Sequence, residues 1–167
     1  GLGDVYKRQA LKESKRPVIY AGGGTIASNA SDELRELNSY IKVPVTNTLM
    51  GLGVYPGTDK YFLGMLGMHG TYQANMAMHN ADLILAIGAR FDDRITNTPS
   101  KFAPKAKIVH FDVDHSSVSK IIEADIAVFG QVKSSLQAIN EKLKLESEEF
   151  DEGRFTDWHN QIADWRK

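Results

Sequence analysis

Hydrophobic runs that end in glycine or in acidic residues divide most of the chain into short predicted strands. The three clearest runs are RPVIYAGGG (16–24), VPVTNTLMGLG (43–53) and DLILAIGARFDDR (82–94). Their apolar residues are continuous rather than alternating, which is typical of parallel strands that are buried on both faces. Three further runs predict strands as well: DKYFLGMLGMHG (59–70), AKIVHFDVD (106–114) and DIAVFGQ (125–131).

Helical patterns lie between these strands. Residues 31–42 are amphipathic, with acids in the first turn and Ser31 as the expected N-cap. Residues 72–81 combine apolar and small side chains, as in a buried helix, and residues 116–124 and 132–143 predict two more helices. Strands that alternate with helices predict an α/β fold, in which a doubly wound, mainly parallel sheet of about six strands carries helices on both faces, as in Rossmann-like domains.

The same pattern predicts three parts along the chain. Residues 1–9 show neither a cap nor a sustained apolar period, and we expect a leader that is non-native or disordered. Residues 10–145 form the predicted domain. Residues 146–167 begin as an acidic linker, and the helical pattern TDWHNQIADWRK that follows is expected to lead into a missing carboxyl-terminal domain.

Composition narrows the classes of function. The 167 residues are 42% hydrophobic, which is enough for one globular core, and 20 Lys and Arg against 21 Asp and Glu leave a net charge of −1. This balance gives no attraction to nucleic acid or to an anionic membrane, and neither partner is expected. With no cysteine, a disulfide framework and a thiolate nucleophile are excluded. No apolar run approaches the ~20 residues of a membrane span. We expect a cytoplasmic protein, most simply a bacterial one.

The first glycine turn matches a known nucleotide-binding pattern only loosely. Gly22, Gly24 and Ala27 fit G-x-G-x-x-G/A, in which the backbone approaches a diphosphate closely. The acid that should follow ~20 residues later is absent, because no Asp or Glu lies between Glu36 and Asp59. An ordinary NAD site is therefore disfavoured, and a tight strand-to-helix turn that holds no ligand explains the glycines equally well.

A cluster of charges follows the strand at 82–94. Arg90, Asp92, Asp93 and Arg94 crowd a strand end, where packing requires no charge. An arginine there can bind a phosphate or a carboxylate through two parallel hydrogen bonds. The alternative is a surface cluster whose charges neutralise one another.

Acids and histidines offer weaker candidates. Asp112 and Asp114, on one face of a predicted strand with His110, could bind ribose hydroxyls or an adenine amine. With His115 they could also bind a metal, although this spacing is a poor metal signature. His69 is either a ligand contact or a turn residue. No complete catalytic set is visible, and the Walker A, H-E-x-x-H and G-x-S-x-G motifs are all absent from the sequence.

The segments RPVIYAGGG, PVTNTLMGLG, LGMHGTYQANMAMHNADLILAIGARFDDR and HFDVD…ADIAVFG, in this order and spacing, resemble the central domain of acetohydroxyacid synthase (acetolactate synthase). The resemblance covers about residues 10–143. It implies membership of the thiamine-diphosphate-dependent enzymes and a catalytic subunit of three α/β domains. The middle domain binds FAD, and the outer two bind thiamine diphosphate and magnesium across a dimer interface. The enzymes of this family condense two 2-ketoacids, pyruvate with pyruvate or with 2-ketobutyrate, with loss of carbon dioxide, in the biosynthesis of valine, leucine and isoleucine.

The resemblance also implies roles for individual residues. Met68 and Arg94 match residues of the substrate pocket, where Arg94 binds the carboxylate of the second ketoacid. No residue of this chain is implied to be catalytic or to bind a metal. The residues implied to bind FAD are Gly22, Gly23, Gly24, Thr48, Leu49, Met50, Leu66, Gly67, Met68, His69, Gly70, Gly88, Ala89, Arg90, Asp92, Asp112, Val113, Gly130 and Gln131.

The chain departs from the family at two positions. Gln131 stands where an Asp is usual, which puts the adenine contact in doubt, and His115 stands where Pro is common. The catalytic glutamate and the thiamine-diphosphate motif of the family would lie in domains that this chain lacks, so we expect the chain alone to be catalytically incompetent. Its implied partners are those domains, a second subunit in a homodimer or tetramer, and a regulatory subunit. The alternative is a flavin-free nucleotide-binding or structural central domain of a related carboligase.

Overall fold

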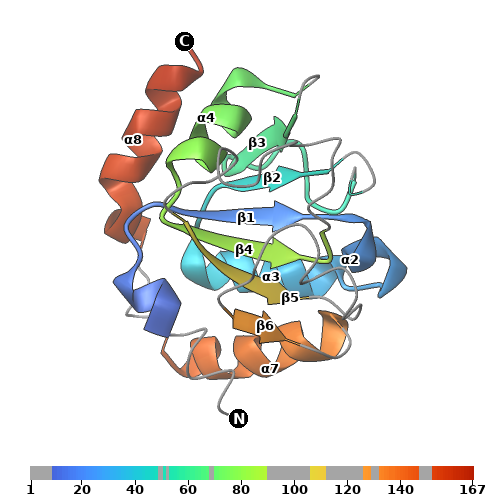
Figure 1. Ribbon diagram of the computed structural model, residues 1–167. Helices are drawn as coiled ribbons and strands as arrows, with labels where there is room; N and C mark the ends of the chain where they lie inside the picture. The colour runs from blue at the N-terminus through green and yellow to red at the C-terminus, as the bar shows by residue number, and fades with distance from the viewer. Residues whose placement is uncertain are drawn as a thin grey trace.

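A computed structural model of the protein describes residues 9–48, 51, 53–67, 70–89, 106–111, 126–128, 132–146 and 152–167. Six parallel strands form one sheet in the order β3-β2-β1-β4-β5-β6 (Figure 1). The predicted α/β fold is confirmed, and the six strands lie within the six predicted segments. They are β1 (Pro17–Ala21), β2 (Val45–Asn47), β3 (Phe62–Met65), β4 (Leu83–Ile87), β5 (Lys107–Phe111) and β6 (Ile126–Val128).

The strand order places a topological switch point between β1 and β4. The chain leaves β1 toward β2 on one side, and returns through β4 on the other side toward β5. In open doubly wound sheets the loops separate at such a point, and ligands bind there beyond the carboxyl ends of the strands. All residues of β1 and β4 are buried, as their continuous apolar sequences predict.

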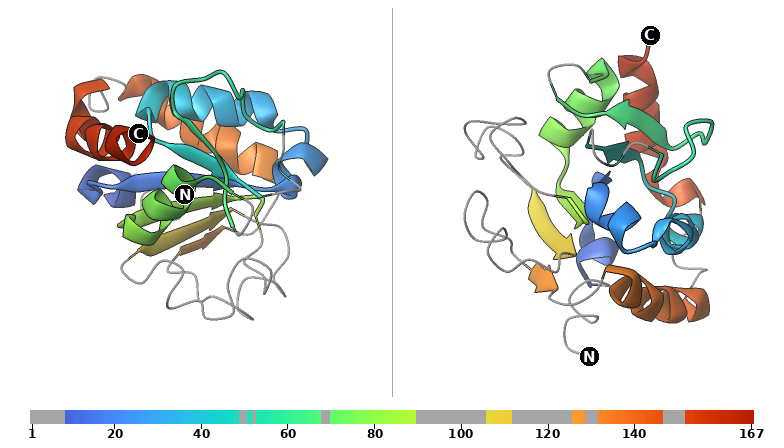
Figure 2. Two further views of the ribbon diagram at one scale, coloured as in Figure 1. Left: turned by 90° about the horizontal axis from the view of Figure 1, so that it is seen from above. Right: turned by 90° about the vertical axis from the view of Figure 1, so that its right-hand side faces the viewer.

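Helices cover both faces of the sheet (Figure 2). On one face α3 (Ser31–Ile41) packs against α7 (Val132–Leu145), and α4 (Tyr72–Asn80) lies on the opposite face. These helices match three of the predicted ones, while the helix predicted at 116–124 lies outside the described residues. A short helix, α2 (Gly23–Ala27), begins inside the glycine run where only a turn was predicted.

The predicted cap of α3 is wrong. The N-cap is Ala30, which has no side chain to accept a hydrogen bond, and Ser31 is the first helical residue. The amide of Ala30 donates to the carbonyl of Thr25, so α2 leads into α3 without a capping side chain. The acids Asp32 and Glu33 still lie in the first turn. Their negative charges stabilise the helix there, because its amino end carries the positive end of the helix dipole.

A buried amide fixes the passage from α3 to β2. The Asn38 Oδ1 atom accepts from the Val43 amide at 2.9 Å, and its Nδ2 donates to the Val43 carbonyl and to the Tyr55 hydroxyl, both at 3.0 Å. Burial raises the pKa of Tyr55 to about 12, so the phenol stays neutral and can accept this bond. Lys42 takes the left-handed conformation that ends the helix.

The last helix, α8 (Thr156–Trp165), lies across the amino ends of the strands. In Figure 1 it is on the left, and the strand arrows point to the right, away from it. The Trp158 indole donates to the carbonyl of Pro17 at the start of β1, at 2.9 Å. The His159 ring contacts the Lys42 carbonyl at 2.9 Å, and the Arg166 guanidinium donates to the Phe62 carbonyl at 2.6 Å. The helix that the sequence predicted as a lead into another domain therefore bonds to the starts of β1 and β3 and to the end of α3.

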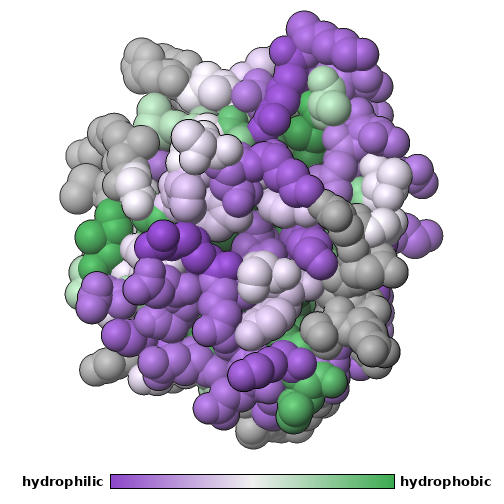
Figure 3. All heavy atoms as spheres, turned by 180° about the vertical axis from the view of Figure 1, so that it is seen from behind, coloured by the Kyte–Doolittle hydropathy of each residue, from purple (hydrophilic) through white to green (hydrophobic). Residues whose placement is uncertain are grey.

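The described residues form no large apolar area on the side opposite to the view of Figure 1. Figure 3 shows this face as mostly hydrophilic, with hydrophobic atoms in small separate areas. Within the described parts of the chain, no helix is long and apolar enough to cross a membrane.

Trp158 should carry much of the attachment of α8. We expect Trp158→Ala to lower the free energy of unfolding by about 3–5 kcal/mol, because it removes a buried indole and its hydrogen bond. Chemical denaturation followed by circular dichroism measures this. The neighbouring exposed residue gives the control, since Asp157→Ala should change stability by about 0.5 kcal/mol or less. Equal stability of the two variants would show that α8 is not an integral part of the domain.

Candidate functional site

The turns after β1 and β4 touch backbone to backbone at the switch point. The Gly22 amide donates to the Ile87 carbonyl at 3.0 Å, and the Gly24 amide donates to the Gly88 carbonyl at 2.8 Å. The Thr25 hydroxyl adds a third bond, to the Ile87 carbonyl at 2.9 Å. The residues of this last pair are 62 positions apart in the sequence. Two distant segments thus form one edge of the site.

Only glycine fits at this contact. A Cβ at Gly22 would lie 2.4 Å from the Gly88 carbonyl oxygen and 2.5 Å from the Ala89 Cα. Gly88 has a φ of +60°, and a Cβ there would lie 2.4 Å from the Thr25 nitrogen. The close approach therefore requires both glycines for steric reasons.

These bonds change the physical interpretation of the glycine motif. The sequence suggested that backbone N–H groups of this turn could hold a phosphate. The N–H groups of Gly22 and Gly24 already donate within the chain, so they are not available for a ligand. What the turn contributes is shape, since it brings two backbone segments without intervening side chains together at the strand ends.

A second turn of the site follows β2. The Thr48 amide donates to the Ala21 carbonyl at 3.0 Å, and the Thr48 hydroxyl accepts from the Gly51 amide at 3.1 Å. A Cβ at Gly51 would lie 2.7 Å from the same Ala21 carbonyl oxygen. The turn after β2 is thereby held against the end of β1, beside the glycine contact.

Asn47, the last residue of β2, carries an unpaired acceptor at this edge. Its Nδ2 donates to the carbonyl of the next residue, Thr48, at 2.9 Å, so the amide extends toward the carboxyl end of the strand. Its Oδ1 is buried and has no hydrogen-bond partner among the described residues, although Asn47 is only 1% exposed. Buried acceptors are nearly always paired in folded proteins, so this atom suits a donor supplied by a ligand or by water.

A third turn, after β3, is held by a side chain from α4. The Asn75 Oδ1 accepts from the Gly67 amide at 3.1 Å, and its Nδ2 donates to the carbonyls of Gly67 and Thr71, both at 3.0 Å. Thr71 caps α4 by accepting from the Ala74 amide at 3.2 Å. Gly67 has a φ of +111°, and among the described residues no atom would lie within 4 Å of a Cβ there. Asn75 thus braces the loop, while Gly67 faces open space.

The described edge therefore brings together predicted residues from separate segments: Gly22, Gly23, Gly24, Thr48, Leu66, Gly67, Gly70, Gly88 and Ala89. The other predicted site residues lie outside the described residues: Leu49, Met50, Met68, His69, Arg90, Asp92, Arg94, Asp112, Val113, Gly130 and Gln131. The same holds for Asp93, Asp114 and His115 and for the side chain of His110.

Sequence reasoning missed the supporting polar residues, which are Thr25, Asn47, Thr71 and Asn75. No local signal singles out Asn75, because α4 also contains the polar residues Gln73, His79 and Asn80. Within the described part of the chain, no group of three or more acidic or histidine side chains could hold a metal ion.

Together, the sheet order and the glycine contact define a doubly wound α/β domain, a class in which ligands bind beyond the carboxyl ends of the strands. The family described as thiamine pyrophosphate enzyme, central domain, matches residues 8–139, and the chain belongs to this family. The sequence resemblance to thiamine-diphosphate-dependent enzymes is thereby confirmed.

Individual relatives are similar over nearly the whole chain. The acetolactate synthase large subunit of Buchnera aphidicola (Acyrthosiphon pisum) is 49% identical over 167 residues, covering 99% of this chain and 29% of that protein. The acetolactate synthase isozyme 3 large subunit of Escherichia coli K12 is 46% identical, over 95% of this chain and 28% of that protein. The chloroplastic acetolactate synthase of Arabidopsis thaliana is 46% identical, over 91% of this chain and 22% of that protein. The chain thus spans about a quarter of the length of these relatives.

The contact between the two turns should be sensitive to a single methyl group. We expect Gly22→Ala to lower the free energy of unfolding by about 3 kcal/mol, because the added Cβ meets backbone atoms that cannot rotate away. Gly57→Ala is the matched control: a Cβ at Gly57 has no atom within 4 Å among the described residues. Urea denaturation of both variants measures the difference. A Gly22→Ala variant as stable as Gly57→Ala would show that the turns do not touch as described.

Proposed function

We propose that this chain is the FAD-binding central domain of an acetolactate synthase catalytic subunit. The observation that carries the proposal is the identity of 46–49% with acetolactate synthase large subunits over at least 95% of the chain. The whole enzyme would condense two 2-ketoacids with loss of carbon dioxide, using thiamine diphosphate and magnesium bound by its other domains. Bound FAD would supply a flavin ring that undergoes no net redox change.

The described residues fit a flavin cofactor in three respects. The edge lies at the topological switch point, where doubly wound domains bind nucleotides. Gly67 leaves open space beside the third turn, and the buried Asn47 Oδ1 needs a donor. FAD offers hydroxyl, imide and amine donors along its whole length. The chain would bind and orient the cofactor through the three turns, and Arg90, Asp92 and the 112–113 segment are proposed to hold its phosphate and adenosine parts.

The remaining parts of the proposal concern the complete enzyme. Its partners would be the other domains of the subunit, a second copy in a dimer or tetramer, and a regulatory subunit. A cytoplasmic location in a bacterium is proposed with them. No described residue of this chain carries a catalytic role in the proposal, so the chain alone would not turn over 2-ketoacids.

FAD binding is tested directly on the 167-residue chain. We expect quenching of flavin fluorescence on titration, and a stabilisation of about 2.7 kcal/mol when free FAD reaches about one hundred times its Kd. FMN and ADP are useful comparisons, because they separate the flavin half from the adenosine half. A folded chain that changes neither flavin fluorescence nor melting temperature would favour the alternative, a flavin-free central domain.

A variant at Asn47 tests the proposed FAD site at one residue in the same titration. We expect Asn47→Leu to weaken FAD binding about tenfold, the loss of one hydrogen bond of ordinary net strength. Asn140 is the matched control, because it is also buried, donates through Nδ2 to the Glu33 carbonyl at 3.0 Å, and has no partner for its Oδ1 in the described part of the chain. It lies on α7, and its bond to Glu33 joins it to α3 rather than to a turn of the proposed site. Equal affinities of Asn47→Leu and Asn140→Leu would remove Asn47 from the proposed site.

Arg94 is proposed to bind the carboxylate of the second ketoacid in the complete enzyme. We expect Arg94→Ala to raise the KM for that ketoacid by about tenfold or more, because a bidentate guanidinium–carboxylate pair is lost. Arg94→Lys should restore little, since an ammonium lacks the planar fork. Steady-state kinetics with the acceptor varied measures both, and Arg35→Ala on the exposed side of α3 is the control. An unchanged KM in Arg94→Ala would contradict this role.

A further inference from the structure

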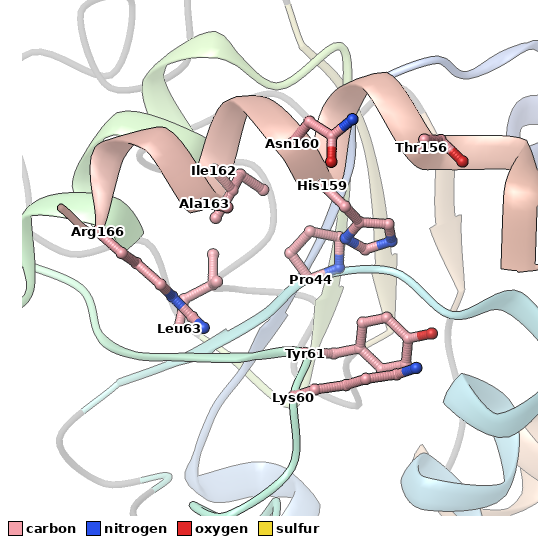
Figure 4. A pocket seen from close by; sticks show the side chains of 10 residues that line it. All are labelled: Pro44, Lys60, Tyr61, Leu63, Thr156, His159, Asn160, Ile162, Ala163 and Arg166. Atoms are coloured by element: carbon pink, nitrogen blue, oxygen red, sulfur yellow. The ribbon is translucent and has the colours of Figure 1, made fainter.

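A groove of about 280 Å³ lies between α8 and the amino ends of β2 and β3. It is on the edge of the sheet opposite to the proposed flavin site, because α8 covers the strand starts (Figure 1). Figure 4 shows its side chains, which come from α8 above and from the segments entering β2 and β3 below. The lining residues are Pro44, Lys60, Tyr61, Leu63, Thr156, His159, Asn160, Ile162, Ala163 and Arg166.

The floor of the groove is apolar and firmly held. Pro44 and Leu63 are buried at the starts of two strands, and Ile162 of α8 is only 3% exposed. His159 contributes a ring that packs at a tilt of 41° against Tyr61, with 5.1 Å between the ring centroids, and its Nε2 contacts the Lys42 carbonyl. Such a surface favours the hydrocarbon part of a ligand.

Basic side chains stand around this floor, and none of the ten lining residues is acidic. Figure 4 shows Arg166 reaching from α8 toward Leu63 at one end of the groove, with Lys60 and His159 at the other. The Arg166 Nη2 donates to the Phe62 carbonyl at 2.6 Å, which uses one of the five N–H groups of the guanidinium and fixes its position. Lys60 Nζ lies 5.1 Å from the Tyr61 ring centroid. The groove therefore combines positively charged side chains with an apolar floor.

We propose that this groove binds a small organic carboxylate with a short aliphatic chain. Arg166 takes the carboxylate, because a guanidinium is planar, weakly hydrated and already oriented by its bond to Phe62. The aliphatic part of the ligand lies on the floor made by Pro44, Leu63 and Ile162. An inorganic anion such as phosphate has no apolar part to contact that floor, and an uncharged aliphatic ligand would leave the guanidinium unmatched. The proposal is independent of flavin binding, since it uses the other edge of the sheet.

Three probes separate these contributions on the 167-residue chain. They are 4-methylpentanoate, its uncharged analogue 4-methylpentanamide, and inorganic phosphate, each titrated while amide NMR shifts are followed. We expect saturable shifts for residues of α8 and of the β3 start with the carboxylate, and affinities weaker by about tenfold or more for the other two probes. Equal affinity for the carboxylate and the amide, or no saturable shift with the carboxylate, would overturn the proposal.

Two neighbouring cationic residues provide the variants. Arg166→Gln should weaken binding of 4-methylpentanoate about tenfold, whereas Lys167→Gln should leave it unchanged. Lys167 has the same charge but is not among the lining residues, and its ammonium lies 3.6 Å from Asp164. Both side chains are exposed, and a far-ultraviolet circular dichroism spectrum checks that each variant is folded. Equal losses in the two variants would show a general effect of charge and would refute the specific role of Arg166.

Discussion

The contact between the β1 and β4 turns is the constraint on which the rest of the structure depends. Gly22 and Gly88 approach so closely that neither tolerates a side chain. The contact brings the carboxyl ends of two strands together at the switch point, and these ends position the turn after β2 through Ala21. The two glycines allow the turns to pack against each other, and they affect a ligand only through that packing.

The two edges of the sheet are built by different means. At the carboxyl edge the described polar contacts mostly join backbone groups, with Thr25, Asn47 and Asn75 as supports. At the amino edge the side chains of α8 and of its C-cap Arg166 reach the backbone carbonyls of two strand starts and of the end of α3. The carboxyl edge thus presents mainly backbone. The amino edge, in contrast, presents side-chain charge over an apolar floor.

Much of the fold could be predicted from the sequence, because fully buried parallel strands have continuous apolar sequences. All six strands lie where such runs occur, and the helices at 31–41, 72–80 and 132–145 follow their helical spacing. The cap of α3 could not be predicted, because Ser31 fits the usual preference while the chain enters the helix from α2 through Ala30. The packing of α8 was equally hidden, since its bonds join residues more than one hundred positions apart, such as the pair separated by 141.

The candidate site was predictable only in part. The glycines and Thr48 follow apolar runs, so strand ends could be recognised from local pattern alone. Asn47 and Asn75 have no such pattern, because their importance comes from partners that tertiary structure brings to them. The direction of the glycine N–H groups is a similar case: whether they face a ligand or a neighbouring strand depends on a contact that local sequence does not encode.

Asn75 has a consequence for how this domain can be altered. Its amide holds both flanks of the turn after β3 from a position one turn into α4. The loop and the first turn of the helix therefore form one structural unit. A chimera that exchanged the loop between relatives would keep its shape only if the first turn of the helix came with it.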